Sequence, residues 1–224
     1  MSRHNLLIIF CGLAPLLVIN YAYWVNIHAP DTLAAVYQCN PYFEGCVSVS
    51  RAVRSGPGLW LFKAIMLPCA IGLIFSWKQI SRWLRYLDPH AKSIRIWTLR
   101  LGIAGVIALA FYVVFLGTEG EIYRWLRRYG VVFFFGFTAL SQLLVARQVW
   151  AGFETVSQSL SALFLVVVGM QWLTGVGSVL KRLVFDDPGL INQLENITEW
   201  LMVALMSLGL VLVGLLMKNH PSKP

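Results

Sequence analysis

Residues 198–217 read TEWLMVALMSLGLVLVGLLM, an apolar run whose single charge, Glu199, stands next to its start. A helix needs about 20 apolar residues to cross the roughly 30 Å hydrocarbon core of a bilayer, and this run meets that length. A water-soluble core does not need several runs of this kind, yet five more approach the same length. They lie at 6–23, 58–77, 97–117, 130–146 and 157–174. The sequence therefore predicts an all-α fold, a polytopic transmembrane six-helix bundle.

The composition agrees with a membrane protein of one domain. Hydrophobic residues make up 58% of the 224 residues and charged residues only 12%, about half the share in an ordinary soluble domain. The longest polar gap, 26–57, leaves no room for a separate soluble domain, so we expect a single transmembrane domain over 1–224. The first run lacks an Ala-x-Ala cleavage site and continues into the aromatic segment 20–24, which favours a retained helix over a signal peptide.

The net charge of +8 points to lipid rather than to nucleic acid. A nucleic-acid partner is excluded because the chain has no soluble basic surface to hold one. Lys and Arg beside a membrane are attracted to anionic headgroups by about 1 kcal/mol each. We therefore expect the bilayer and anionic phospholipid as partners, with other membrane-protein subunits as a further possibility.

Basic residues also indicate which side of the membrane the loops face. With the N-terminus in the cytoplasm, ten of the 18 Lys and Arg residues fall on the cytoplasmic side and eight on the outer side. This excess is small, but the segment 78–100 holds six of the ten and lies beside helix ends, where the positive-inside rule is strongest. We expect both termini in the cytoplasm and the segment 26–57 outside. The small size and short loops favour a bacterial cell inner membrane.

The cysteines are consistent with this orientation. Cys39 and Cys46 lie in the expected outer loop, separated by six residues that include a Pro and a Gly. A short ring of this kind closes in an oxidising compartment, which predicts a disulfide; two free loop thiols are the alternative. Cys11 and Cys69 fall within apolar runs and are expected to pack as small apolar residues.

Three further segments, 78–87, 119–129 and 181–194, are amphipathic. In each of them charged residues interleave with aromatic or aliphatic residues. Beside transmembrane helices, this pattern is typical of short interfacial helices that lie in the headgroup plane. We expect such helices in these three segments.

The first outer loop carries the polar chemistry that a headgroup needs. Ser48, Ser50, Arg51 and Arg54 directly precede a Gly-Pro-Gly turn at 56–58 that opens the second helix. Backbone N–H groups at a helix start bind anions, and Arg adds a two-pronged donor for phosphate. The alternative is a solvated loop whose arginines pair with two acids of the same loop. Those acids are Asp31 and Glu44.

Two charges lie within predicted helices near the outer side. Lys63 belongs to the second run and Glu199 to the sixth, at comparable depth. Ionisable groups inside a membrane are candidates for function, and an ion pair between these two would satisfy both; Lys63 extending to the interface is the alternative. The lipid- or anion-binding candidates are then Ser48, Ser50, Arg51, Arg54, Lys63 and Glu199.

Signatures of catalysis and of metal binding are missing from the sequence. The four histidines lie in loops or tails on both sides of the predicted membrane, where they cannot converge on a metal. The chain contains no His-Glu-x-x-His, Gly-x-Ser-x-Gly, P-loop or Cys-x-x-Cys. We expect no metal and no cofactor, and the sequence favours a non-enzymatic protein that binds lipid or organises membrane lipid.

Two other functions stay open. One is a structural subunit or assembly factor of a larger membrane complex, which would dock through the aromatic residues of the fourth run. The other is an enzyme that modifies lipid in the outer leaflet, with Asp31, Glu44 or Glu199 as general base. The aromatic residues in question are Phe133, Phe134, Phe135 and Phe137.

Three features of the layout occur together: six helices with inside termini, the hydroxyl motif VSVS at 47–50 before the second helix, and Glu199-Trp200 opening the last helix. In this combination the chain resembles the Frag/DRAM/Sfk family of membrane proteins. The resemblance implies a lipid-linked role, because eukaryotic members take part in remodelling GPI-anchor lipid, in lysosomal membrane and autophagy regulation, or in plasma-membrane lipid organisation. The chain departs from the family by its insert bounded by cysteines at 39–46 and by Arg51 and Arg54.

Overall fold

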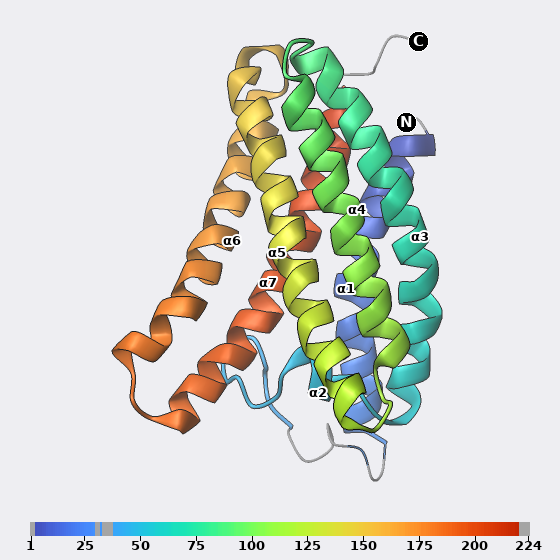
Figure 1. Cartoon of the computed structure of the whole chain (residues 1–224), viewed down its shortest axis with the longest axis vertical. Helices are drawn as coiled ribbons and strands as arrows, with labels where there is room; N and C mark the ends of the chain where they lie inside the picture. Colours follow the sequence, from blue (N-terminus) through green and yellow to red (C-terminus); the bar gives the residue numbers. More distant parts are fainter. Residues whose placement is uncertain (1–2, 30–31, 33–37, 220–224) are drawn as a thin grey trace.

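The computed structural model describes residues 3–29, 32 and 38–219, and these residues form a bundle of long helices without a strand (Figure 1). Six of the helices are long and apolar enough to cross a membrane. The predicted all-α six-helix bundle is therefore confirmed. The elements are α1 (Arg3–Ile27), α2 (Val49–Ala52), α3 (Gly56–Leu87), α4 (Lys92–Phe115), α5 (Glu121–Ala151), the 3-10 turn η1 (Phe153–Thr155), α6 (Gln158–Val184) and α7 (Pro188–Asn219).

The amphipathic segments differ from the prediction of separate interfacial helices. Residues 78–87 continue α3, residues 121–129 form the start of α5, and residues 181–194 are divided between the end of α6 and the start of α7. Nothing in the sequence interrupts helix propagation where the apolar run meets the first of these segments. In the third segment, α6 ends at Val184 and α7 begins at Pro188. Pro188 favours the start of a new helix, because Pro is common in the first turn of a helix.

The helices pack in a ring in which α7 is the most enclosed member. α1 packs between α3 and α7, α4 packs between α3 and α5, and α6 packs mainly on α7. In the most apolar window of α7, 67% of the residues are buried, whereas the figure for α6 is 22%. Figure 1 shows α6 leaning away from α5 toward its far end. α6 is therefore the outermost helix of the bundle.

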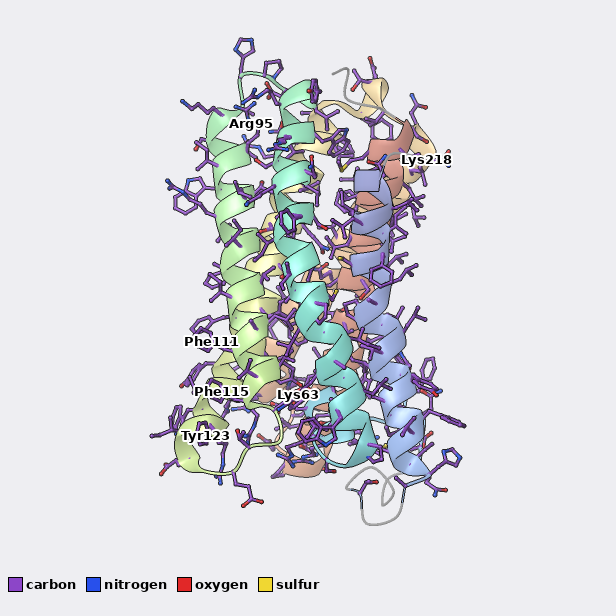
Figure 2. All side chains as sticks on the ribbon, turned by 90° about the vertical axis from the view of Figure 1, so that its right-hand side faces the viewer. Lys63, Arg95, Phe111, Phe115, Tyr123 and Lys218 are labelled. Carbon is purple, nitrogen blue, oxygen red and sulfur yellow. A yellow bond between two sulfur atoms is a disulfide. The ribbon has the colours of Figure 1, made fainter. Side chains whose placement is uncertain are left out.

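The two ends of the bundle carry different features. The start of α1 and the end of α7 lie at one end, which also carries Arg95 and Lys218 (Figures 1 and 2). The other end, called the loop end from here on, carries α2, the segment 38–48 and the turn 116–120 between α4 and α5. The first helix thus begins at the end of the bundle where the last one finishes, as six membrane crossings require.

Candidate functional site

The disulfide predicted between Cys39 and Cys46 is present. The ring and the residue that follows it, Val47, are attached to α7 by three side chains that donate to backbone carbonyls. The Gln193 amide donates to Glu44 O at 2.7 Å, the Asn196 amide to Gly45 O at 2.7 Å, and the Trp200 indole N–H to Val47 O at 2.9 Å. The indole of Trp200 is fully buried, so its hydrogen bond lies in the interior, where an unpaired N–H is costly.

Helix α1 holds the same segment from the other side. The Tyr23 hydroxyl donates to Cys39 O at 3.0 Å, and the Asn20 amide donates to the Tyr42 hydroxyl at 2.9 Å. The rings of Tyr23 and Tyr42 meet the Trp200 ring edge-on, with centroid separations of 5.5 and 5.2 Å. Burial raises the pKa of Tyr42 above its ordinary value, so this phenol is neutral at physiological pH.

A second anchor, the buried side chain of Asn26, lies at the end of α1. Its amide N–H groups donate to Ala52 O and Ser55 O, both at 2.9 Å, and its amide oxygen accepts from Gly58 N at 2.9 Å. One side chain thus joins α1, the end of α2 and the start of α3. Sequence reasoning passed over Asn26, because a single Asn at the end of an apolar run gives no indication of three partners so far along the chain.

Three of the six predicted site residues hold α2 in place. Ser48 is the N-cap of α2, and its hydroxyl accepts from Arg51 N at 3.3 Å. The Glu199 carboxylate accepts from Val49 N at 3.1 Å, and the Ser50 hydroxyl bonds the Tyr112 hydroxyl at 3.1 Å. α2 is thereby tied to α7 and to α4.

The predicted ion pair between Lys63 and Glu199 is wrong. The Lys63 ammonium donates to Val114 O at 3.0 Å and lies 5.8 Å from the centre of the Trp60 ring. Val114 O is one of the last four carbonyls of α4. These carbonyls receive no N–H from within the helix, and the negative end of the helix dipole favours a positive charge beside them. Lys63 therefore serves the end of α4, while Glu199 serves α2.

Arg51 and Arg54 make no ion pair within the parts of the chain that the structure describes. The Glu44 carboxylate, one of their predicted partners, instead accepts from Asn40 N at 2.9 Å. The other predicted partner, Asp31, lies outside the described residues, so the pairing with it stays a prediction. Arg51 is exposed, whereas Arg54 is half-buried.

Arg54 lines a groove at the loop end, together with two arginines from the first turns of α5. The groove encloses about 620 Å³, and we refer to it as the arginine groove. Its lining contains three arginines and a single acid, Glu119, so the net charge of the lining is positive. Its lining residues are Arg54, Ser55, Gly117, Thr118, Glu119, Gly120, Arg124 and Arg127.

The turn between α4 and α5 sets the shape of this groove. Gly117 adopts φ +83°, which side chains disfavour, and a Cβ there would lie 2.5 Å from Leu59 Cδ2 of α3. Arg127 reaches back over the turn and donates to Phe115 O at 3.2 Å and to Thr118 O. Arg127 thereby holds the turn to α5, and Gly117 lets the turn approach Leu59 of α3 and the backbone of Arg54, which lies between α2 and α3.

The aromatic run of α5 is divided between two surroundings. Phe134 and Phe135 pack against the buried core, whereas Phe133 and Phe137 line a groove on the outer surface between α4 and α5. The run therefore does not form the single docking face considered from the sequence.

Sequence reasoning did not bring Arg124 and Arg127 to the site. Both fall in a segment that was interpreted as an interfacial helix, and their meeting with Arg54 depends on how the turn folds against α3. Their only signal in the sequence was a place on the same predicted side of the membrane.

Comparisons with protein-family models, with curated proteins and with solved structures find no match. The resemblance to the Frag/DRAM/Sfk family therefore stays a prediction. Over the described residues, His, Cys, Asp and Glu do not gather in any group of three that could hold a metal.

Proposed function

We propose that this integral membrane protein binds the headgroup of an anionic phospholipid in the arginine groove. The observation that carries the proposal is the convergence of Arg54, Arg124 and Arg127 on one groove against a single acid. Arginine is suited to phosphate because its planar fork donates two parallel hydrogen bonds. The volume of about 620 Å³ is in the usual range for a small-molecule site.

The residues that hold α2 in place also position the part of the arginine groove that carries Arg54. Arg54 follows α2 by two positions, so the side chains that hold α2 also place Arg54. These are the Glu199 carboxylate, the Ser50 hydroxyl and the Asn26 amide. In this proposal Ser48, Ser50 and Glu199 are positioning residues, and the contacts with the headgroup come from the three arginines.

We further propose that the loop end faces the outside of the cell, in a bacterial inner membrane. The Cys39–Cys46 disulfide supports this orientation, because disulfides persist in oxidising compartments and are rare in the cytoplasm. The termini would then lie in the cytoplasm, and the lipid would belong to the outer leaflet.

Native mass spectrometry of the full chain in mild detergent tests the proposal. We expect wild-type protein to retain added phosphatidylglycerol in preference to phosphatidylcholine. The double variant Arg54→Gln/Arg124→Gln should lower that retention about tenfold or more, because a charge-assisted hydrogen bond contributes roughly 1.5–3 kcal/mol. The structure gives neither side chain a hydrogen bond within the described residues, so the fold should persist.

A matched control removes the same charge elsewhere at the loop end. Arg51→Gln/Arg128→Gln also lowers the net charge by two, but neither residue lines the groove. Its phosphatidylglycerol retention should equal that of the wild type. Equal loss in both double variants would reject a specific site in favour of general charge attraction. Co-purification of a protein subunit whose release depends on Arg54 and Arg124 would favour a structural subunit instead.

A further inference from the structure

A second groove lies on the outer surface between α4 and α5. It encloses about 290 Å³ and is almost entirely apolar. Its α5 wall is aromatic: Trp125, Tyr129 and Phe133 are 51%, 45% and 49% exposed, and each stacks on the next at centroid separations of 5.3 and 6.1 Å. Phe133 in turn stacks on Phe137 at 5.7 Å. Four aromatic rings thus form one continuous wall.

The floor of this groove consists of small residues. Ala104 and Ala108 come from α4 and Gly130 from α5. A Cβ at Gly130 would lie 3.0 Å from Ala108 O, so the missing side chain is what lets the two helices approach so closely. A groove between large side chains over a floor of small residues suits a slender apolar chain. It suits an α-helix less well, because a helix with its side chains is about 10–12 Å wide.

Both grooves take part of their lining from α5. Arg124 and Arg127 lie in its first two turns, and the aromatic wall follows from Trp125 to Phe137. At 1.5 Å per residue, the distance from Arg127 to Phe137 along the helix is about 15 Å. That is about half of the roughly 30 Å hydrocarbon core, which is the depth of one leaflet.

A second row of rings runs from the end of α4 to the first turn of α5. Phe111 stacks on Phe115 at 6.4 Å, and Phe115 stacks on Tyr123 at 5.3 Å. Figure 2 shows these three side chains following one outer edge of the bundle toward the loop end. The aromatic surface therefore covers the last turns of α4 and continues to Tyr123 in the first turn of α5.

We infer that the α4–α5 groove holds an acyl chain of the same lipid whose phosphate lies in the arginine groove. The inference rests on the proposed function and adds the class of ligand: a glycerophospholipid with an anionic headgroup, bound by its head and one chain together. Charge complementarity decides the occupant, because Arg124 and Arg127 lie in the first turns of the same helix that carries the aromatic wall, and they favour an anion over a polypeptide helix. The exposed face of α6 is equally apolar, but the arginine groove does not adjoin it.

Photo-crosslinking in nanodiscs tests the inference, with a phosphatidylglycerol that carries a diazirine in one acyl chain. We expect crosslinks at 104–111 and 125–137 to exceed those on the exposed face of α6, 163–180, several-fold. Arg54→Gln/Arg124→Gln should lower the excess to the α6 level. Phosphatidylcholine with the same diazirine chain should show no excess in the wild type.

A substitution that fills the α4–α5 groove tests the acyl-chain site separately from the headgroup site. Ala104→Phe should abolish the excess of crosslinks yet leave phosphatidylglycerol retained in native mass spectrometry, while Ala162→Phe, on the exposed surface of α6, should change neither. If Ala104→Phe does not fold, Phe133→Ala, which opens the wall, should lower the excess in its place.

The outcomes distinguish the inference from the proposed function. Even crosslinking over α4, α5 and α6, with arginine-dependent lipid retention intact, would overturn the chain groove alone. Loss of arginine dependence in native mass spectrometry would overturn the headgroup site, whatever the crosslinks show. Peptide-to-peptide crosslinks across the groove would assign it to a second copy of the chain or to a partner helix, and would also overturn the inference.

Discussion

The carboxylate of Glu199 in α7 accepts a hydrogen bond from the backbone N–H of Val49, the first residue of α2, at 3.1 Å and across 150 residues of sequence. The first N–H groups of a helix have no partner within it, and a carboxylate both satisfies one of them and complements the positive end of the helix. α2 is only one turn long, so this contact and the Ser48 cap hold an element that could not persist alone.

Glu199→Ala should therefore destabilise the loop end. It leaves Val49 N unpaired, and we expect a loss of about 1–3 kcal/mol, because a half-buried donor without a partner costs about that much. Glu199→Gln keeps an acceptor oxygen and should lose less. Thermal unfolding in detergent measures both variants, and equal melting temperatures for wild type and Glu199→Ala would refute this role.

Lys63 and Glu199 should behave independently. Because Lys63 donates to Val114 O and Glu199 accepts from Val49 N, the two side chains share no partner. In a double-mutant cycle with Lys63→Met and Glu199→Gln, we expect the two effects on unfolding free energy to add within about 0.5 kcal/mol. A coupling energy well above that value would contradict this expectation and support an ion pair between the two side chains.

Asn26→Ala should lower the free energy of unfolding more than the substitutions of Lys63 or Glu199. It removes three hydrogen bonds, those donated to Ala52 O and Ser55 O and the one accepted from Gly58 N, and two of them lie in buried surroundings. At about 1 kcal/mol for each bond, we expect a loss of about 3 kcal/mol. Asn26→Asp keeps the acceptor for Gly58 N but loses both donors, so it is not a rescue. Hydrogen exchange at 52–58 should report the loosening directly, and unchanged protection there would argue against the anchor.

Removal of the disulfide should loosen the segment without unfolding the bundle. Cys39→Ala/Cys46→Ala opens a short ring, for which chain entropy gives a stabilisation of roughly 2–3 kcal/mol. The attachments to α1 and α7 remain, so we expect a lower melting temperature but the same helix content by circular dichroism. A reducing agent should have the same effect on the wild type and none on the double variant. A wild-type melting temperature that does not respond to reduction would show that the ring contributes nothing.

The orientation can be tested with single reporter cysteines at the two ends. In a background without Cys39 and Cys46, Glu119→Cys lies at the loop end and His90→Cys at the other end, and both positions are exposed. A membrane-impermeant maleimide applied to intact spheroplasts should label Glu119→Cys and spare His90→Cys until the membrane is broken. The reverse pattern would place the loop end, and the proposed headgroup site, in the cytoplasm.

The features that sequence predicted well depend on local composition. Long apolar runs predict the number of transmembrane helices, because a chain that crosses hydrocarbon must satisfy its backbone hydrogen bonds internally and a helix does so. The disulfide was also accessible, since only eight residues from Cys39 to Cys46 close the ring.

The features that sequence missed depend on rotation and packing. Depth in the membrane follows from residue spacing, so Lys63 and Glu199 were placed at similar levels. The direction in which each points depends on how α3 and α7 are turned, and Lys63 reaches α4 whereas Glu199 reaches α2. The meeting of Arg54 with Arg124 and Arg127 is hidden for the same reason, because it requires the turn 116–120 to fold against the start of α3.

Residues 39–47, which contain the disulfide ring, are held through their main chain: four hydrogen bonds end on the carbonyls of Cys39, Glu44, Gly45 and Val47. A carbonyl is present whatever side chain a residue carries. Exposed positions such as Phe43 are thus open to replacement, provided that the ring keeps its length. The loop end could consequently diversify or accept a grafted epitope while the bundle beneath it remains unaltered.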